Sequence, residues 1–165
     1  MSEPYIVAAG AFDRAANLRT AIFAFDIIKY ALPGWRLKLH GDGPERASLQ
    51  ALALRLGFDD LRIDFLQWTI PLVDLVSNAA FAWNVHRTTG SGFLRLATSL
   101  GVPAAAMRNR EIEAANLGLE LVPMDDHVAL ASATFETILA GCHRAGAVLR
   151  ADLVPSLALQ YTSDG

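Results

Sequence analysis

The chain has 165 residues, of which 53% are hydrophobic and 19% are charged, with a net charge of −3 and one cysteine, Cys142. This balance excludes a disordered chain, an internal disulfide, a cysteine-based zinc site and a general nucleic-acid-binding protein. The sequence lacks an apolar run of the ~20 residues that span a bilayer, and residues 1–20 lack a signal peptide. We therefore expect one domain over residues 1–165, cytoplasmic, with no transmembrane segment, no metal, no resident cofactor and no nucleic-acid partner.

The first part of the chain alternates short apolar runs with longer amphipathic ones. Residues 5–9 form an apolar run of the kind found in buried strands. Apolar residues then recur at helical spacing over residues 18–32, up to a Pro-Gly pair that ends helices. A second strand is predicted over residues 35–40, and a helix over residues 44–57 with Pro44 at its first position.

The alternation continues to the end of the chain. A third strand, over residues 61–66, mixes apolar and charged side chains, which favours a place near the sheet edge. A helix is predicted over residues 71–78, a fully apolar strand over residues 79–85, and a helix from the end of the loop 86–91 to residue 101. The remaining predicted elements are strands over residues 102–107 and 119–122 and helices over residues 128–142 and 153–161.

Six strands that alternate with helices predict an α/β fold. Parallel strands need crossovers of a dozen or more residues, and the helical segments supply them. We predict a single doubly wound, Rossmann-like parallel sheet of about six strands, with helices on both faces.

Ligands of open parallel sheets bind at the carboxyl ends of the strands, near the point where the strand order reverses. Three segments that leave predicted strands carry small residues and glycines before a helix start, where backbone N–H groups can face a phosphate. This pattern predicts a nucleotide-type ligand. The candidate residues are Gly10, Ala11, Phe12, Arg14 and Asn17 in the first segment, Gly41, Asp42, Gly43 and Pro44 in the second, and His86, Ser91, Gly92 and Phe93 in the third.

Each of these segments also has a simpler explanation. Glycine and proline between a strand and a helix are ordinary turn residues. The dinucleotide fingerprint Gly-x-Gly-x-x-Gly and the Walker-type Gly-x-x-x-x-Gly-Lys are both absent from the sequence. The three loops together therefore favour a nucleotide only modestly.

The order of the motifs resembles the carboxy-terminal half of GT-B-fold glycosyltransferases, in the retaining class called group 1 or family 4. The most specific stretch is residues 35–45, WRLKLHGDGPE, which is similar to the second strand and the Gly-Asp-Gly-Pro turn of that family. Residues 92–103 resemble its Glu-Gly-Phe to Glu-Ala-Met-Ala-x-Gly-x-Pro segment, and residues 118–131 resemble its late strand and helix start. The resemblance extends over residues 5–161.

The resemblance implies a nucleotide-sugar donor, with the base near Gln67, Trp68 and the turn 41–44. In the family an Arg and a Lys after the first strand hold the diphosphate, and two glutamates contact the sugar and the ribose. The Arg falls on Ala11 and the Lys on Ala16.

The two glutamates are also missing. The second falls on Leu96, and the first falls on Ser91 or, without a gap, on Thr88. All four charged positions are thus neutral here, and a diphosphate leaving group needs fixed cations or donors. Arg14, Arg87 and Arg95 are possible substitutes, although a solvated surface arginine is the more common explanation for each. His86 is a further candidate at the site, although a lone histidine in a loop is more often structural or solvated.

Members of the family also carry an amino-terminal half that binds the acceptor. The resemblance therefore implies a missing amino-terminal lobe or a partner subunit for this chain. Trp68, Phe93 and Trp83 are candidates for an apolar patch that faces such a partner, although core packing is the better explanation for Trp83.

Two functions stay open at this point. The first is the nucleotide-sugar-binding domain of a glycosyltransferase, with donor phosphates held by backbone amides of residues 10–12 and 91–93, and with little activity in the isolated chain. The second is a non-catalytic scaffold or assembly subunit that pairs with another chain. An unrelated flavodoxin-like domain is less favoured, because the first strand is not followed by the acidic cluster of phosphoacceptor receivers.

Overall fold

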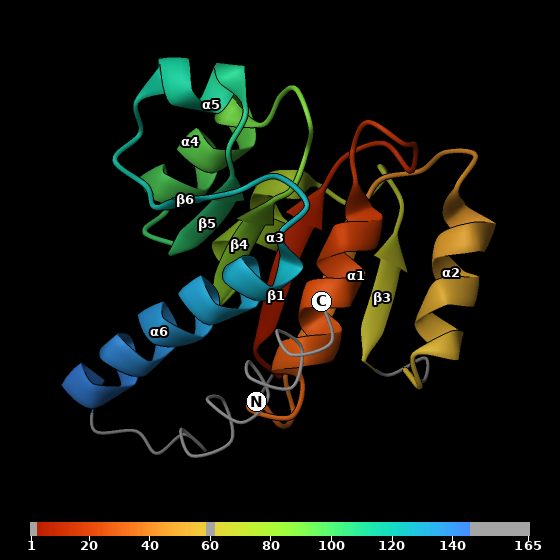
Figure 1. Cartoon of the computed structure of the whole chain (residues 1–165), viewed down its shortest axis with the longest axis horizontal. Coiled ribbons are helices and arrows are strands. Elements are labelled where there is room, and N and C mark those ends of the chain that lie inside the picture. The colour runs from red at the N-terminus through yellow and green to blue at the C-terminus, as the bar shows by residue number, and fades with distance from the viewer. Residues whose placement is uncertain (1–2, 59–61, 146–165) are drawn as a thin grey trace.

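The computed structural model describes residues 3–58 and 62–145 (Figure 1). Its strands are β1 (Tyr5–Ala9), β2 (Arg36–His40), β3 (Ile63–Leu66), β4 (Phe81–Asn84), β5 (Ala104–Met107) and β6 (Leu121–Val122). Its helices are α1 (Leu18–Ile28), α2 (Arg46–Arg55), α3 (Leu72–Ser77), α4 (Ser91–Ser99), α5 (Arg110–Ala115) and α6 (His127–Ala145).

The strands form one sheet in the order β3-β2-β1-β4-β5-β6, and the five pairings within the described residues are all parallel. The chain therefore moves outward in one direction from β1 to β3, and in the other from β4 to β6. The strand order reverses between β1 and β4, which makes the gap between their carboxyl ends the topological switch point of the sheet.

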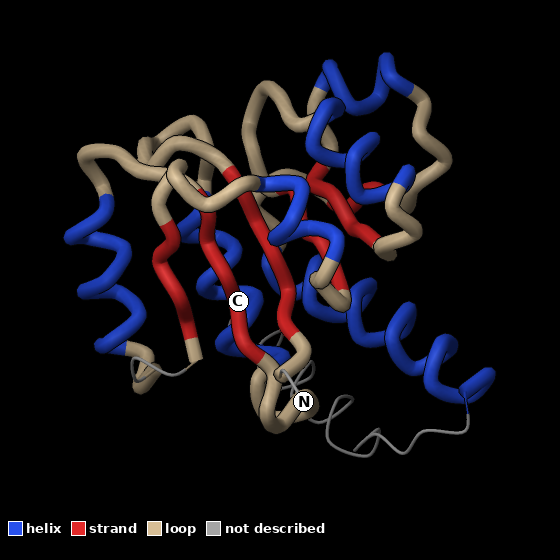
Figure 2. Tube along the Cα trace, turned by 180° about the vertical axis from the view of Figure 1, so that it is seen from behind, coloured by secondary structure: helices blue, strands red, loops and turns tan. Residues whose placement is uncertain are grey.

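Helices cover both faces of the sheet, as the views from the two sides show (Figures 1 and 2). One face carries α1, α2 and α6 over a large apolar core that contains Ile6, Leu39 and Trp83. The other face carries α3 and α4 over Val7 and Ala82, with α5 beside α4. Successive strand residues thus enter opposite layers, as the two-residue period of a strand requires.

The predicted α/β class, the six parallel strands and the two helical layers are confirmed. The edge position predicted for the third strand is confirmed as well, because β3 is the outermost strand on its side. Most predicted elements are one to four residues longer than the observed ones. The helix predicted over residues 153–161 lies outside the described residues.

Two differences from the sequence-based prediction have physical reasons. The second helix begins at Arg46 instead of Pro44, because the Glu45 amide first donates to the Phe12 carbonyl at 2.8 Å and holds this stretch as a turn. Helix α5 was not predicted, since its six residues are too short to show a helical period.

Two further observations concern the described residues alone. None of their helices combines the length and the apolarity needed to cross a membrane. Nor do three or more of their His, Cys, Asp and Glu side chains gather in a way that would hold a metal ion.

Candidate functional site

Backbone hydrogen bonds join the loops that follow β1 and β2 at the carboxyl edge of the sheet. The Gly10 amide donates to the His40 carbonyl at 3.0 Å, and the Phe12 amide donates to the Asp42 carbonyl at 2.9 Å. The Phe12 side chain is fully buried beneath this junction. The structure thus brings together the first two candidate segments, but the amides of Gly10 and Phe12 already have partners inside the chain.

The glycines of the β2–α2 turn are required by this close approach. A Cβ on Gly41 would lie 1.9 Å from the Gly10 carbonyl oxygen, and a Cβ on Gly43 would lie 2.6 Å from that of Phe12. Real Cβ atoms do not come this close to a backbone oxygen, so only glycine fits at either position. Asp42 is exposed and accepts a hydrogen bond from the Gly43 amide at 2.9 Å.

The loop after β3 presents an exposed aromatic side chain next to these turns. Trp68 is 53% exposed, and its ring meets the buried His40 ring edge-on, with centroids 5.2 Å apart. His40 Nε2 lies 2.7 Å from the Ile70 carbonyl oxygen, while its buried Nδ1 has no hydrogen-bond partner among the described residues. Gln67 is exposed beside Trp68. His40 was not a sequence-based candidate, and its position at the end of a strand was the only signal for it.

The loop after β4 is closed by its own side chains. His86 Nδ1 accepts hydrogen bonds from the amides of Thr88 at 3.2 Å and Thr89 at 3.1 Å, so that nitrogen carries no proton. Asn109 donates to the His86 and Thr89 carbonyls at 2.9 and 3.0 Å, and Asn84 donates to Thr89 at 3.0 Å. This network gives His86 a structural role.

A carboxylate occupies the N-terminus of α4. Glu111, on α5, accepts hydrogen bonds from the Ser91 hydroxyl at 2.6 Å and from the Ser91 amide at 3.0 Å. These two donors lower the pKa of Glu111 below its ordinary value of 4.5, the hydroxyl contributing most. The amide predicted to hold a phosphate therefore already binds an internal anion. Gly92 is exposed at the next position, and Phe93 is half-buried.

A polar cluster joins the loops that follow β1, β4 and β6. Asn17, in the left-handed conformation with φ of 60°, donates to the Val85 carbonyl and to Asp125 Oδ1, both at 3.1 Å. Arg87 donates to Asp125 Oδ2 at 2.9 Å and to Asn17 Oδ1 at 3.3 Å. The Arg87 guanidinium holds the pKa of Asp125 below its ordinary value. Asp125 was not among the sequence-based candidates.

The positions where the resemblance places basic residues are neutral and enclosed. Ala11 is half-buried, and Ala16 is fully buried, with its Cβ 2.9 Å from where a Cβ on Gly10 would lie. Arg14 and Arg95, two of the possible substitutes, are exposed. The structure therefore leaves Arg87 as the arginine bonded into the junction of the loops.

Of the three residues predicted to form an apolar patch, Trp68 is exposed, Phe93 is half-buried and Trp83 is buried. Trp83 is fully buried and donates through its indole nitrogen to the Thr134 hydroxyl at 2.7 Å, so it belongs to the core. Pro44 is exposed at the rim of the turn 41–44.

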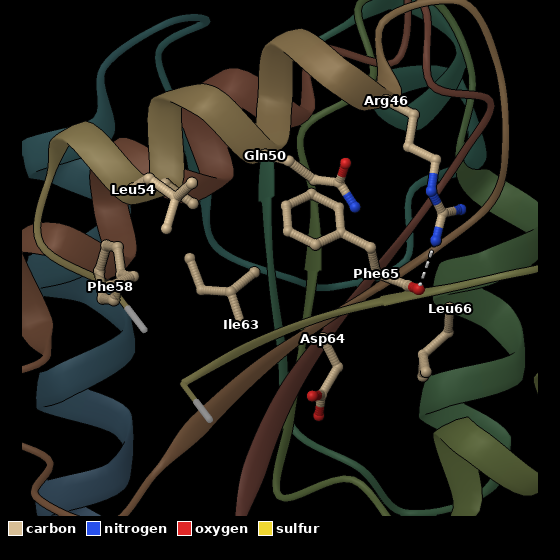
Figure 3. A pocket seen from close by; sticks show the side chains of 9 residues that line it. Arg46, Gln50, Leu54, Phe58, Ile63, Asp64, Phe65 and Leu66 are labelled. Atoms are coloured by element: carbon tan, nitrogen blue, oxygen red, sulfur yellow. Dashed lines mark hydrogen bonds between the residues drawn. The ribbon is translucent and has the colours of Figure 1, made fainter. Parts of the chain in front are cut away.

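A separate groove of about 470 Å³ runs along the sheet edge between α2 and β3 (Figure 3). Arg46 reaches across one end of it and donates to the Phe65 carbonyl at 3.1 Å. Its lining residues were not sequence-based candidates. They are Arg46, Gln50, Ala53, Leu54, Phe58, Ile63, Asp64, Phe65 and Leu66.

Comparison with known proteins finds likeness in structure. No protein-family model and no curated protein matches the sequence. The catalytic domain of cholesterol-alpha-glucosyltransferase from Helicobacter pylori matches 97% of this chain over 99% of its own, with a TM-score of 0.70 and 16% identity. The C-terminal domain of the glycosyl transferase group 1 family protein LpcC from Francisella tularensis matches 82% of this chain over 75% of its own, with a TM-score of 0.68 and 13% identity.

The chain has the fold of the carboxy-terminal domain of GT-B glycosyltransferases. The pneumococcal O-GlcNAc transferase GtfA, in complex with UDP and GlcNAc, matches 94% of this GT-B-like domain over 31% of its own length, with a TM-score of 0.68 and 14% identity. The domain spans about a third of the chain of GtfA and of several other neighbours, between 28% and 33%. At sequence identities as low as these, the structural similarity establishes the fold alone.

Proposed function

We propose that this GT-B-like domain binds the nucleotide-sugar donor of a glycosyltransferase, and that the isolated chain has little transfer activity. The observation that carries the proposal is the meeting of three candidate loops at the carboxyl edge of a sheet whose fold matches the UDP-bound GtfA over 94% of this chain. Open parallel sheets bind nucleotides at this edge.

The nucleoside end of the donor fits the side of the edge formed by the loops after β2 and β3. The exposed Trp68 indole offers an apolar face on which a base can stack. The turn 41–44 provides glycine backbone that a ribose or base can approach closely. Stacking is tolerant of base identity, so this arrangement supports nucleoside binding without naming the base.

The diphosphate end of the donor is held less strongly. Ala11 and Ala16 supply no charge, and the amides of Gly10, Phe12 and Ser91 are bonded within the chain. Loss of one donor to a developing oxyanion costs about 2.7–4 kcal/mol of transition-state stabilisation. Weak donor binding and very slow transfer are therefore expected together.

Calorimetry with UDP, GDP, ADP, CDP and their sugar conjugates tests this proposal. At least one nucleoside diphosphate is expected to bind, with a dissociation constant in the high micromolar to millimolar range. Trp68→Ala is expected to weaken that binding about tenfold, since stacking on an aromatic side chain is worth about 1–3 kcal/mol. Tyr30→Ala is the matched control, because Tyr30 is an aromatic residue of similar exposure, 55%, that follows α1. Absence of heat with every ligand at millimolar concentration overturns the proposal.

A second function is favoured by the contact between Glu111 and Ser91. A site whose helix N-terminus already holds a carboxylate suits a domain that no longer binds donors. Such a domain would serve as a non-catalytic scaffold or assembly subunit, paired with a missing amino-terminal lobe or another chain. Light scattering of the purified domain and a pull-down from its native host separate the two functions, because a monomer that captures no partner excludes the scaffold. The cytoplasmic location stays a prediction.

A further inference from the structure

Arg87 lies at the switch point of the sheet. It follows the carboxyl end of β4, and its amide donates to the Ala15 carbonyl, in the loop after β1, at 3.0 Å. β1 and β4 are the two strands between which the order reverses. Ligands of doubly wound sheets bind in the crevice outside this point.

The guanidinium contacts a carboxylate beside the start of a helix. Arg87 donates to the side chain of Asn17, the residue that precedes α1, and the first turn of α1 carries no acidic residue. A helix N-terminus has a partial positive charge and disfavours a cation beside it. Asp125 is the carboxylate that the guanidinium contacts. Asp13, in the loop after β1, accepts a hydrogen bond from the Ala16 amide at 2.9 Å. The guanidinium thus lies beside a helix start, where an anion from solution would be stabilised.

The guanidinium also has donors to spare. It carries five N–H groups in a planar fork, and the contacts to Asp125 and Asn17 use two of them. The Arg87 side chain is 41% exposed, so a ligand can reach it from solvent. Arg46, which donates to the Phe65 carbonyl, and Arg108, which is paired with Glu113, follow β2 and β5 and do not lie at the switch point. A guanidinium fork binds phosphate in a bidentate manner, which a surface point charge does not.

We propose that Arg87 is the residue that binds the diphosphate of the donor, replacing the cations absent at Ala11 and Ala16, and that Asp125 is a counter-charge that weakens this binding. The inference rests on the proposed function, since it names the group that grips the donor of that site. It also accounts for neutral residues at the usual basic positions, because the cation comes from the loop after β4 instead of the loop after β1.

The test measures binding of UDP and of uridine by NMR titration of the whole chain. Arg87→Ala is expected to weaken UDP binding about tenfold or more and to leave uridine binding unchanged, because charge-assisted contacts to phosphate are lost. Arg87→Lys is expected to retain part of the affinity. Asp125→Asn is expected to strengthen UDP binding about threefold, since it frees the guanidinium from its counter-charge while an amide oxygen still accepts from Asn17. Arg55→Ala, which removes an exposed arginine in the last turn of α2, is the matched control.

Arg87→Ala and Asp125→Asn are expected to change the affinity for UDP in opposite directions. This difference separates a phosphate-binding role of Arg87 from a structural one. If the Arg87–Asp125 pair only held the loops together, both substitutions would weaken UDP and uridine binding alike. Equal UDP binding by Arg87→Ala and the unmodified chain overturns the inference and leaves the proposed function standing. If the unmodified chain binds no nucleoside diphosphate of the panel, the proposed function fails and the inference fails with it.

Discussion

The two halves of the carboxyl edge are held together by different kinds of contact. On the side of β1 and β2, main-chain hydrogen bonds link the loops, and glycine allows backbone to touch backbone at Gly41 and Gly43. On the side of β4 to β6, the Arg87 amide donates to the Ala15 carbonyl, but most of the contacts between the described loops are made by side chains. The residues that contribute these side chains are Asn17, Asn84, His86, Arg87, Asn109, Glu111 and Asp125.

This difference means that one half of the edge tolerates little substitution, whereas the contacts of the other half can be exchanged. Main-chain contacts at van der Waals distance leave no freedom for substitution, so the β1–β2 half is suited to shaping a site. Side-chain hydrogen bonds can be exchanged for bonds to a ligand at modest net cost, because each contributes only about 0.5–1.5 kcal/mol. The contacts of the β4–β6 half can therefore be changed by substitution more easily than those of the β1–β2 half.

The largest effect is expected when a methyl group is added to a glycine of the β1–β2 half. In Gly41→Ala the added Cβ would lie 1.9 Å from the Gly10 carbonyl oxygen, so the two loops must separate. The free energy of unfolding is expected to fall by about 3 kcal/mol or more, at the upper end of overpacking costs. Urea denaturation measures it.

Gly92→Ala is the control for that substitution. Gly92 lies in the first turn of α4, and nothing is within 4 Å of its added Cβ. Because alanine is a better helix former than glycine, the variant is expected to be neutral or up to about 1 kcal/mol more stable. Equal losses at both positions would show that the close approach of the loops is not what requires glycine at Gly41.

A smaller effect is expected from Asn109, which links the β4–α4 loop to α5. Its oxygen accepts from the Ile112 amide at 2.9 Å, and its amide group donates to two loop carbonyls. Asn109→Ala is expected to cost about 1–3 kcal/mol, because buried polar groups lose their partners. Asn109→Asp keeps the cap but loses both donors, so it should open the loop 86–90 to hydrogen exchange without unwinding α5. Asn78→Ala, at an exposed helix end, should change stability by less than about 0.5 kcal/mol.

The β1–β2 half of the carboxyl edge was largely predictable from the sequence. Apolar runs located the strands, and Gly41 to Pro44 marked the turn after β2, because glycine and proline impose local backbone requirements that a sequence displays directly. The alternation of charged and apolar residues around Arg62 and Asp64 was enough to place β3 at an edge, because edge strands tolerate charge.

The β4–β6 half of the carboxyl edge was not predictable in the same way. Its contacts join residues 20, 38 and 108 positions apart in the chain, through single polar groups that follow no period. Glu111 lies on a helix that is too short to show a helical pattern, so the sequence did not indicate that it would contact Ser91. Arg87 could be named as a possible cation, but its position depends on Asp125 and Asn17, which only the folded chain brings together.

The smallest effect concerns pH, and it distinguishes the carboxylate at the α4 N-terminus from an ordinary surface acid. The folded pKa of Glu111 is lowered below 4.5, so its contribution to stability is present above pH 4.5 and is lost as the pH falls through the folded pKa. In Glu111→Gln, the free energy of unfolding should therefore fall relative to the unmodified chain at pH 7, and the difference should shrink at pH 3. Urea denaturation at both pH values measures this. Glu113→Gln is the control, since Glu113 is an exposed acid paired with Arg108 and such pairs contribute little. A difference that persists unchanged at pH 3 would mean that the Glu111 side chain stabilises α4 by packing and not by its charge.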